Sequence, residues 1–290
     1  MPSRRSASLR RFSPSADGRG PGPVTTLILD LDGVIYRGQQ ALPAAAETVA
    51  WLRQHGYVVT FLTNNSTRTR TFYARTLRHL GIPAHPEDIR SSGPATARYL
   101  RQQGPPDPTV LVVGEWGLRR ELANAGFRLV THNERAPVDF VVTGMDRHFN
   151  YAKLVAAQQA ILHGARFIAT NRDPTYPTET GLLPGGGTVV AAIEACTGVS
   201  PVVIGKPQTF IVEEILEETG ARPRETMVVG DRLDADIEMG RRAGLRTVLV
   251  LTGVTSREEA ETAPRRRRPH WIIDTLAELP DLLTRLGGRP

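Results

Sequence analysis

The sequence predicts an α/β protein with a Rossmann-like, mostly parallel sheet. Short runs of apolar and β-branched residues recur along the 290 residues, and stretches with helical spacing of apolar residues lie between them. Strands that alternate with helices indicate βαβ units, in which neighbouring strands are parallel. The expected strands are residues 25–30, 58–63, 109–114, 139–144, 166–170, 201–205, 226–230, 246–251 and 270–274.

The first expected strand ends on two acids. Asp30 and Asp32 are separated by one leucine in the stretch TTLILDLDGV. Because successive strand side chains point to opposite faces, both carboxylates project to the same side. Two such charges about 4 Å apart repel each other by about 4 kcal/mol at an effective dielectric constant of about 20. The pair therefore predicts a bound cation or a shared proton at this strand end.

Polar residues also follow three later strands, in the stretches TNNST, GKP and GDRLDAD. Ligands of parallel α/β sheets bind beyond the carboxyl ends of the strands, so we expect the chemistry there. Between the first and second of these places, from Ser66 to Lys206, the chain is long enough for a further α/β module. We predict a first core segment at residues 23–88, an inserted domain at 89–189 and a second core segment at 190–290.

Two glycine-rich or acidic stretches could indicate other sites. The glycines at 185–187 do not form a phosphate loop, because Lys206 is followed by Pro207 and Ser200 stands where the first glycine of that motif belongs. We expect a hinge and a helix start there. The DLDG stretch is not a calcium loop, because a strand precedes it and Ala41 stands where a bidentate Glu is required.

Composition narrows the class of protein. The chain is 40% hydrophobic and 23% charged, with a net charge of +6. Much of the excess basic charge lies in the first eleven residues and in Arg265–Arg268, without interleaved aromatic residues, so we expect no nucleic-acid binding. Cys196 is the single cysteine, which excludes an intramolecular disulfide and a cysteine-rich metal site. We expect Cys196 to serve only in packing.

The N-terminal residues 1–22 are rich in Arg and Ser and contain no apolar signal region. We predict a disordered basic extension. The composition also resembles an organelle transit peptide, and a start codon assigned too far upstream would explain it equally well. No stretch approaches the roughly 20 apolar residues of a membrane span, so we expect no membrane partner and a cytoplasmic location.

The motifs DLDGVIYRG, FLTNNST, IGKP and VVGDRLDADIEMG resemble, in this order, the four motifs of the haloacid dehalogenase (HAD) superfamily. The long insertion resembles the α/β cap of its nitrophenylphosphatases, phosphoglycolate and pyridoxal phosphatases and NagD-type enzymes. The resemblance implies a Mg²⁺-dependent phosphatase. Asp30 would be the nucleophile that forms an aspartyl-phosphate, and Asp32 the general acid and base that also binds the metal through its backbone carbonyl. Asp231 would complete the metal site, and the family pattern favours Asp236 over Asp234 as its support.

The same resemblance implies a phosphate site made of Thr63, Asn64, Asn65 and Lys206, whose hydroxyl, amide, backbone and ammonium groups would donate to phosphate oxygens. A lysine here is unexpected on composition alone, because only two of the 36 basic residues are Lys. The expected partner is a small phosphorylated metabolite, and the family suggests a homodimer through the cap.

The stretch NRDPTYPTETG resembles the specificity loop of the cap, so Asp173 and Tyr176 are candidate specificity residues. In pyridoxal phosphatases the position of Tyr176 carries a histidine that contacts the substrate, and this difference argues against pyridoxal phosphate. Packing of Tyr176 inside the cap or between two protomers is an equally good interpretation.

Two rival functions remain open at the level of sequence, and a third, a kinase, is excluded. A metal-independent dehalogenase of the same fold uses an Asp nucleophile but needs neither Asp32 nor Asp231. A kinase would need the missing phosphate loop. A regulatory protein with a relict site would keep the fold but lose the activity, and phosphatase activity that depends on Mg²⁺ separates it from the enzyme.

Overall fold

The computed structural model describes residues 23–287 except 132, 135 and 179–180. The predicted extension at residues 1–22 lies outside this part. The chain divides into two compact units, one formed by the described residues up to Val59 together with those from Thr219 onward, and one formed by Thr60–Glu218. Within the described residues, no helix has both the length and the apolar character needed to cross a bilayer.

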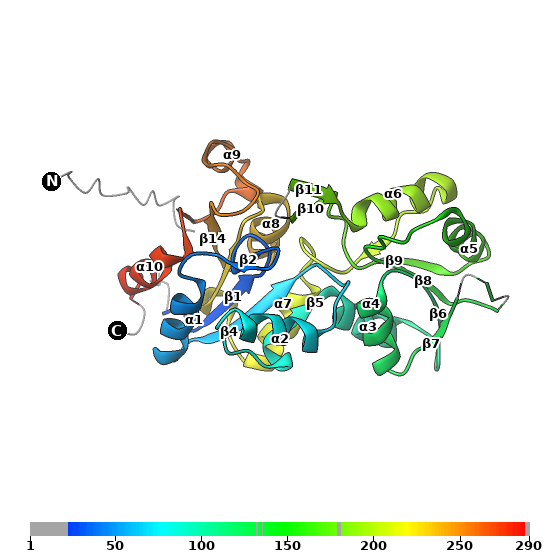
Figure 1. The fold of residues 1–290 in the computed structure, drawn as a ribbon, viewed down its shortest axis with the longest axis horizontal. Helices are drawn as coiled ribbons and strands as arrows, with labels where there is room; N and C mark the ends of the chain where they lie inside the picture. Colours follow the sequence, from blue (N-terminus) through cyan, green and yellow to red (C-terminus); the bar gives the residue numbers. More distant parts are fainter. Residues whose placement is uncertain (1–22, 132, 135, 179–180, 288–290) are drawn as a thin grey trace. The chain divides into compact units, whose positions relative to one another are not determined.

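The first unit is a parallel sheet covered by helices (Figure 1). Its strands lie in the order β15-β14-β13-β1. Strand β4 (Val58–Thr63) begins beside β1, where the amide of Val58 donates to the carbonyl of Thr25 at 2.9 Å. The strands are β1 (Thr26–Asp30), β13 (Thr226–Gly230), β14 (Arg246–Val250) and β15 (Trp271–Ile273), with a short antiparallel pair, β2 (Tyr36–Arg37) and β3 (Gln40–Ala41).

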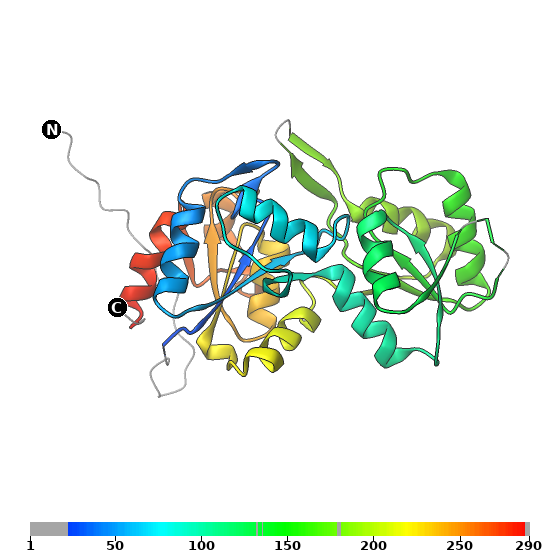
Figure 2. The same cartoon turned by 60° about the horizontal axis from the view of Figure 1, so that its bottom comes forward.

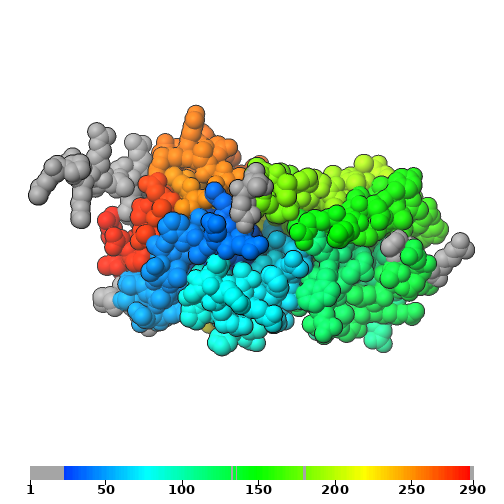
Figure 3. Space-filling view, in the orientation of Figure 1, coloured from blue at the N-terminus to red at the C-terminus, as the bar shows by residue number. Residues whose placement is uncertain are grey.

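The helices of this unit are α1 (Ala45–Gln54), α8 (Glu238–Arg242), α9 (Arg257–Thr262) and α10 (Leu279–Arg285). Helix α1 packs beside α10, and α9 and α10 reach the surface of the unit (Figure 3). The strands β1, β13 and β14 are buried at every position, as expected for a sheet covered on both faces.

The second unit contains a parallel sheet in the order β12-β9-β8-β6-β7. Helices α5 and α6 cover one face and α3 and α4 the other (Figure 2). The sheet consists of β6 (Thr109–Val113), β7 (Arg128–Val130), β8 (Phe140–Thr143), β9 (Arg166–Ala169) and β12 (Val202–Val203). The helices are α3 (Ser92–Gln103), α4 (Trp116–Asn124), α5 (Tyr151–Leu162) and α6 (Gly186–Thr197).

The second unit also contains the main part of β4 (Val58–Thr63), which pairs in parallel with β5 (Ile89–Ser91). A separate antiparallel hairpin is formed by β10 (Thr175–Thr178) and β11 (Gly181–Pro184). Helix α2 (Arg70–His79) and helix α7 (Phe210–Thr219) complete the unit. One hydrophobic core lies between the five-stranded sheet and the helices α5 and α6. It includes Val141 and Phe167 of the strands, Ile161 of α5 and Ile193 of α6.

The predicted α/β fold class is confirmed, and each of the nine expected strands is present. One strand lies elsewhere than expected. We placed residues 201–205 in the second core segment, but β12 pairs with β9, so it extends the sheet of the second unit beyond residue 189. The helix start at the glycine run is present, because α6 begins at Gly186.

Candidate active site

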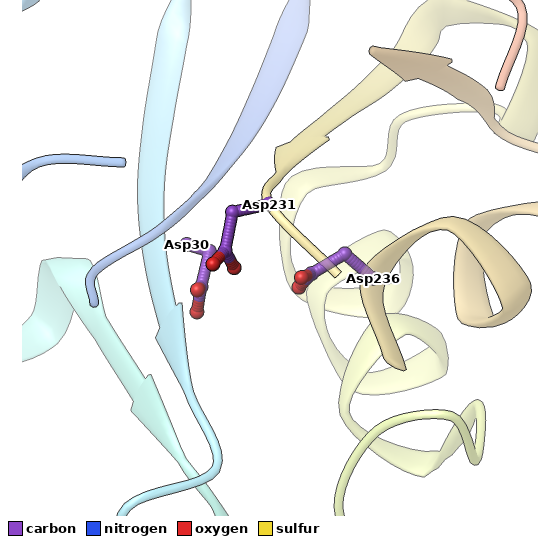
Figure 4. A group of neighbouring side chains, drawn as sticks. All are labelled: Asp30, Asp231 and Asp236. Atoms are coloured by element: carbon purple, nitrogen blue, oxygen red, sulfur yellow. The ribbon is translucent and has the colours of Figure 1, made fainter. Parts of the chain in front are cut away.

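Three buried carboxylates meet in the first unit (Figure 4). Asp30 is the last residue of β1, Asp231 directly follows β13, and Asp236 lies in a π-helical turn, Leu233–Ile237. One carboxylate oxygen from each lies within 4.8 Å of the others. Asp231 and Asp236 are 1% and 0% exposed. Parallel pairing of β1 with β13 explains the meeting, because both strands end at the same edge of the sheet.

The turn after β1 is fixed by its own backbone. The carbonyl of Leu31 accepts hydrogen bonds from the amides of Ile35 and Tyr36 at 2.9 and 3.1 Å. Gly33 lies inside this turn with φ of 84°, a left-handed conformation that favours glycine. The tight turn holds Asp32 directly beyond the strand end, where its backbone bridges to Tyr36.

Glycines pack against Asp231 on two sides. A Cβ atom at Gly33 would lie 2.6 Å from Oδ2 of Asp231, and one at Gly253 would lie 2.0 Å from the same oxygen. The amide of Val254 donates to that oxygen at 2.8 Å. No side chain larger than hydrogen fits at either position without moving the carboxylate. Neither glycine was expected at the site from its sequence, although the strand-end stretch LTGVT was a signal for Gly253.

A similar contact fixes Asp236. A Cβ atom at Gly230, the last residue of β13, would lie 2.2 Å from the Cβ and Cγ atoms of Asp236. The amide of Arg232 donates to Oδ2 of Asp236 at 3.2 Å. Asp234 instead pairs with the Arg232 guanidinium at 3.1 Å and is half-buried. The structure thus places Asp236, and not Asp234, in the acidic group.

The acidic group fits a hard divalent cation. Mg²⁺ prefers carboxylate and carbonyl oxygens, and three buried carboxylates this close need a positive charge or protons between them. Asp30 and Asp231 were expected as ligands and Asp236 as their support, and all three reach the same place. The carboxylate of Asp32 is not part of the group, so the acids that gather with Asp30 are Asp231 and Asp236 and not the Asp32 carboxylate expected from strand alternation. The family resemblance implied a metal contact through the backbone carbonyl of Asp32.

The predicted phosphate-binding residues lie in the second unit, at the end of β4. Thr63 is its last residue, and its Oγ1 accepts from the amide of Asn65 at 3.0 Å. Oδ1 of Asn65 accepts from the amide and the hydroxyl of Thr67 at 3.0 and 2.7 Å. In the part of the chain that the structure describes, Nδ2 of Asn65 donates to no protein group. This amide is therefore available to an anion.

Asn64 and Lys206 come together in the same unit, with Asp173 of the predicted specificity loop. Oδ1 of Asn64 accepts from the amide of Lys206 at 2.8 Å, and Nδ2 of Asn64 donates to the Lys206 carbonyl at 3.1 Å and to the Asp173 carboxylate at 3.0 Å. The side chain expected to bind phosphate is thus occupied by protein groups. The contact with Asp173 had no sequence signal, because it joins positions 109 residues apart.

Tyr176 lies on β10, half-buried, opposite Leu183 of β11. With Arg147 and Leu183 it lines a cavity of about 390 Å³. Arg147 donates to the Glu115 carboxylate at 2.7 Å, and this bond is the first cause that raises the pKa of Arg147, with a smaller contribution from Tyr176. Burial opposes the shift in Glu115, yet the bond to Arg147 lowers the pKa of that carboxyl.

Comparisons with known proteins agree with this geometry. Residues 27–128 match the family model of haloacid dehalogenase-like hydrolases, and residues 203–279 match a second model, HAD-hydrolase-like. The 5'-nucleotidase YutF of Bacillus subtilis is 41% identical over 251 residues, which cover 87% of this chain and 95% of that protein. The chain belongs to the haloacid dehalogenase superfamily. Within it, the chain falls among the phosphatases with a large inserted cap.

Two further relatives support this HAD assignment. Chronophin of Rattus norvegicus is 38% identical over 279 residues, covering 92% of this chain and 89% of the relative. The glycerol phosphate phosphatase Rv1692 from Mycobacterium tuberculosis, solved in complex with magnesium, has a TM-score of 0.82 at 39% identity, covering 88% of this chain and 76% of that one. Magnesium is accordingly the cofactor that the acidic group suits.

Proposed function

We propose that this HAD phosphatase hydrolyses small phosphate monoesters through a phosphoryl group carried on Asp30. The observation that carries the proposal is the burial of Asp30 at a strand end, within 4.8 Å of two further carboxylates that are also buried. A carboxylate can attack an anionic phosphate only where positive charge offsets the repulsion between them. Three acids at one place supply the ligands for that charge.

Bound Mg²⁺ would be held by Asp30, Asp231 and the backbone carbonyl of Asp32, with Asp236 beside them, and would neutralise charge on the phosphate. In the first step an oxygen of Asp30 forms a bond to phosphorus while the bond to the leaving oxygen breaks, and Asp32 gives that oxygen its proton. In the second step water attacks phosphorus, Asp32 takes a proton from this water, and the bond to Asp30 breaks. Phosphate and free enzyme result.

The mechanism requires donors for the other phosphate oxygens, and we assign them to the second unit. Thr63 offers its hydroxyl, Asn65 its side-chain amide, and Lys206 its ammonium group. The side-chain Nδ2 of Asn65 supports this assignment because it donates to no protein group among the described residues.

The substrate class follows from the relatives and the cap. By their names, relatives of this chain are a 5'-nucleotidase, an acid sugar phosphatase and a glycerol-3-phosphate phosphatase. We propose that this chain acts on a metabolite of this size, selected by Tyr176 in a cap formed by residues 89–189 and extended to β12. We further propose a cytoplasmic enzyme and a homodimer through the cap.

A direct assay tests the proposal. The purified protein should hydrolyse p-nitrophenyl phosphate with Mg²⁺, lose that activity with a chelator, and regain it when Mg²⁺ is restored. Incubation with ³²P-labelled substrate followed by an acid quench should trap label that hydroxylamine releases, as expected for an acyl phosphate. Activity on a haloacid without metal would support the dehalogenase instead. A folded protein with neither activity would support the regulatory alternative. A panel of phosphorylated metabolites then ranks the substrates.

A further inference from the structure

The side chain of Asn64 holds the main chain of Lys206 by a reciprocal pair of hydrogen bonds. Oδ1 of Asn64 accepts from the amide of Lys206 at 2.8 Å, and Nδ2 donates to its carbonyl at 3.1 Å. A primary amide bonded in this way replaces the peptide group of a neighbouring strand. Asn64 and Lys206 are 5% and 4% exposed, so water does not compete for these bonds.

The second hydrogen of Nδ2 points to Asp173. Its two carboxylate oxygens lie 3.0 and 3.2 Å from Nδ2 of Asn64. A hydrogen bond to a carboxylate is stronger than one between neutral groups and fixes the rotation of the amide. With both N–H groups and Oδ1 engaged by protein, the Asn64 amide has no donor left for a phosphate.

The loop that carries Asp173 is itself fixed. The amide of Asp173 donates to Oδ1 of Asn171 at 3.1 Å, and its carbonyl accepts from the amide of Gly187 at 2.9 Å. Nδ2 of Asn171 donates to the Asn64 carbonyl at 2.8 Å. A Cβ atom at Gly185 would lie 2.4 Å from the Asp173 carbonyl oxygen. The glycine run thus allows close packing of this loop, in addition to starting α6.

The residue before Lys206 is shaped by the same contacts. A Cβ atom at Gly205 would lie 2.4 Å from Oδ1 of Asn64 and 2.5 Å from the carbonyl of Thr170. The hydroxyl of Ser92 donates to the Asn64 carbonyl at 2.6 Å. Residues from three separate parts of the chain therefore meet around Asn64, and the only side chain among them with a long positively charged end is that of Lys206.

We propose that Asn64 and Asp173 are positioning residues for Lys206, and that they set where its ammonium group meets the phosphate. The proposal rests on the proposed function, because phosphate binding by Lys206 is itself part of that function. It gives Asp173 a role that all substrates share, since every phosphate monoester presents the same group to Lys206. It differs from our expectation that Asn64 binds phosphate and that Asp173 selects the substrate.

A double-mutant cycle tests this dependence. In the parent, Asn64→Ala should lower kcat/KM for p-nitrophenyl phosphate on the order of 100-fold, the scale of a misplaced catalytic group, and Asp173→Ala about tenfold. In a Lys206→Ala background each should cost less than about twofold, because there is no ammonium group left to position. Full losses in both backgrounds would overturn the proposal.

The range of substrates separates positioning from selection. Asp173→Ala should reduce kcat/KM by the same factor for p-nitrophenyl phosphate and glycerol phosphate. Asp173→Asn should recover most of the loss, because its side-chain oxygen still accepts from Asn64. Arg172→Ala is the matched control from the same loop, since its side chain bonds Glu194 at 3.1 Å. A loss confined to one substrate would overturn positioning and restore selection.

Phosphate binding gives a readout that does not depend on turnover. Inorganic phosphate should raise the Tm of the Mg²⁺-loaded parent and of Arg172→Ala equally, and should raise that of Asp173→Ala less at the same concentration. Equal shifts in all three proteins would contradict the proposal. If Asn64→Ala does not fold, Asp173→Ala in both backgrounds decides the matter. An inactive parent would refute the proposed function, whereas an active parent with additive losses would refute only the positioning.

Discussion

Two sets of polar side chains are held in place by opposite means. One is the acidic group of the first unit, and the other is the amide network of the second, in which Asn64 bonds Lys206 and Asp173. Asp30, Asp231 and Asp236 crowd three charges of one sign within 4.8 Å, and two of them are pressed into place by glycines. The side-chain amide of Asn64 instead donates a hydrogen bond to the Asp173 carboxylate within the protein. The acidic group therefore needs a cation to complete it, while the amide network is complete before any ligand binds. Changes in the first should alter metal dependence, and changes in the second should not.

The largest effect is expected for Asp30→Asn. Loss of a covalent nucleophile should reduce kcat by on the order of 10⁴-fold or more, while the fold survives because the side chains are nearly equal in size. Asp234→Asn is the matched control, since this nearby acid pairs with Arg232 outside the acidic group. Turnover of p-nitrophenyl phosphate by both variants decides it. A folded Asp30→Asn protein that retains activity would refute Asp30 as nucleophile.

The next effect tests the crowding of the acidic group. Gly253→Ala would place a methyl group 2.0 Å from Oδ2 of Asp231, so the carboxylate must move. We expect the Mg²⁺ concentration for half-maximal activity to rise roughly 10- to 100-fold, as for other changes around metal ligands. Asp231→Ala should act in the same direction, and high Mg²⁺ should recover part of the activity of both.

Gly93→Ala is the control for Gly253→Ala. A Cβ atom at Gly93 would lie 3.6 Å from its nearest neighbour, an ordinary van der Waals contact. Its Mg²⁺ titration should overlay that of the parent. A Gly253→Ala titration that also overlays the parent would mean that Asp231 does not determine metal affinity.

The sequence predicted the acidic group better than the amide network. Asp30, Asp231 and Asp236 follow or lie near the ends of strongly apolar strands, so the parallel sheet alone predicts that they approach one another. The contact of Gly33 and Gly253 with Asp231 could not be predicted, because a close approach depends on how two loops cross in space.

The amide network was out of reach for a different reason. Asn64 and Asp173 are polar residues of loops, and such residues often bond to nearby backbone groups. Which acceptor the Asn64 amide finds depends on backbone groups at Lys206, 142 residues away. Strand β12 shows the same limit, because two strand residues do not specify which sheet they join. Long apolar strands were predictable, whereas short strands such as β2, β3 and β5 were missed.

The third effect concerns the stability of the first unit, apart from its chemistry. Burial, with the nearby cations Arg241 and Arg246, lowers the pKa of His270 from 6.5 to about 4. The guanidinium of Arg241 contacts Nε2 of His270 at 2.7 Å. A guanidinium only donates, so Nε2 must accept and the folded state needs the neutral ring. The charged ring would lose this bond.

The sign of the effect follows from the lowered pKa. Below pH 6.5 the unfolded chain binds a proton that the folded chain refuses until about pH 4, so stability falls as the pH falls through this window. The ring is partly exposed, and allowing for solvent screening we expect a loss of roughly 1 to 2 kcal/mol between pH 7 and 5. Urea unfolding should show a smaller loss for His270→Gln. Equal losses in both proteins would contradict the assignment to His270.

The smallest effect should come from Tyr176, and it is confined to one class of substrate. If the tyrosine contacts the leaving group, Tyr176→Ala should reduce kcat/KM about tenfold for the preferred substrate, as lost pocket contacts do. Hydrolysis of acetyl phosphate, which has almost no leaving group to contact, should change far less. Tyr176→Phe keeps the ring and removes only the hydroxyl beside Arg147, so it separates ring packing from the polar contact. This pattern is the opposite of the uniform loss expected for Asp173→Ala. An equal loss on both substrates, or none, would mean that Tyr176 only packs the base of the β10–β11 hairpin.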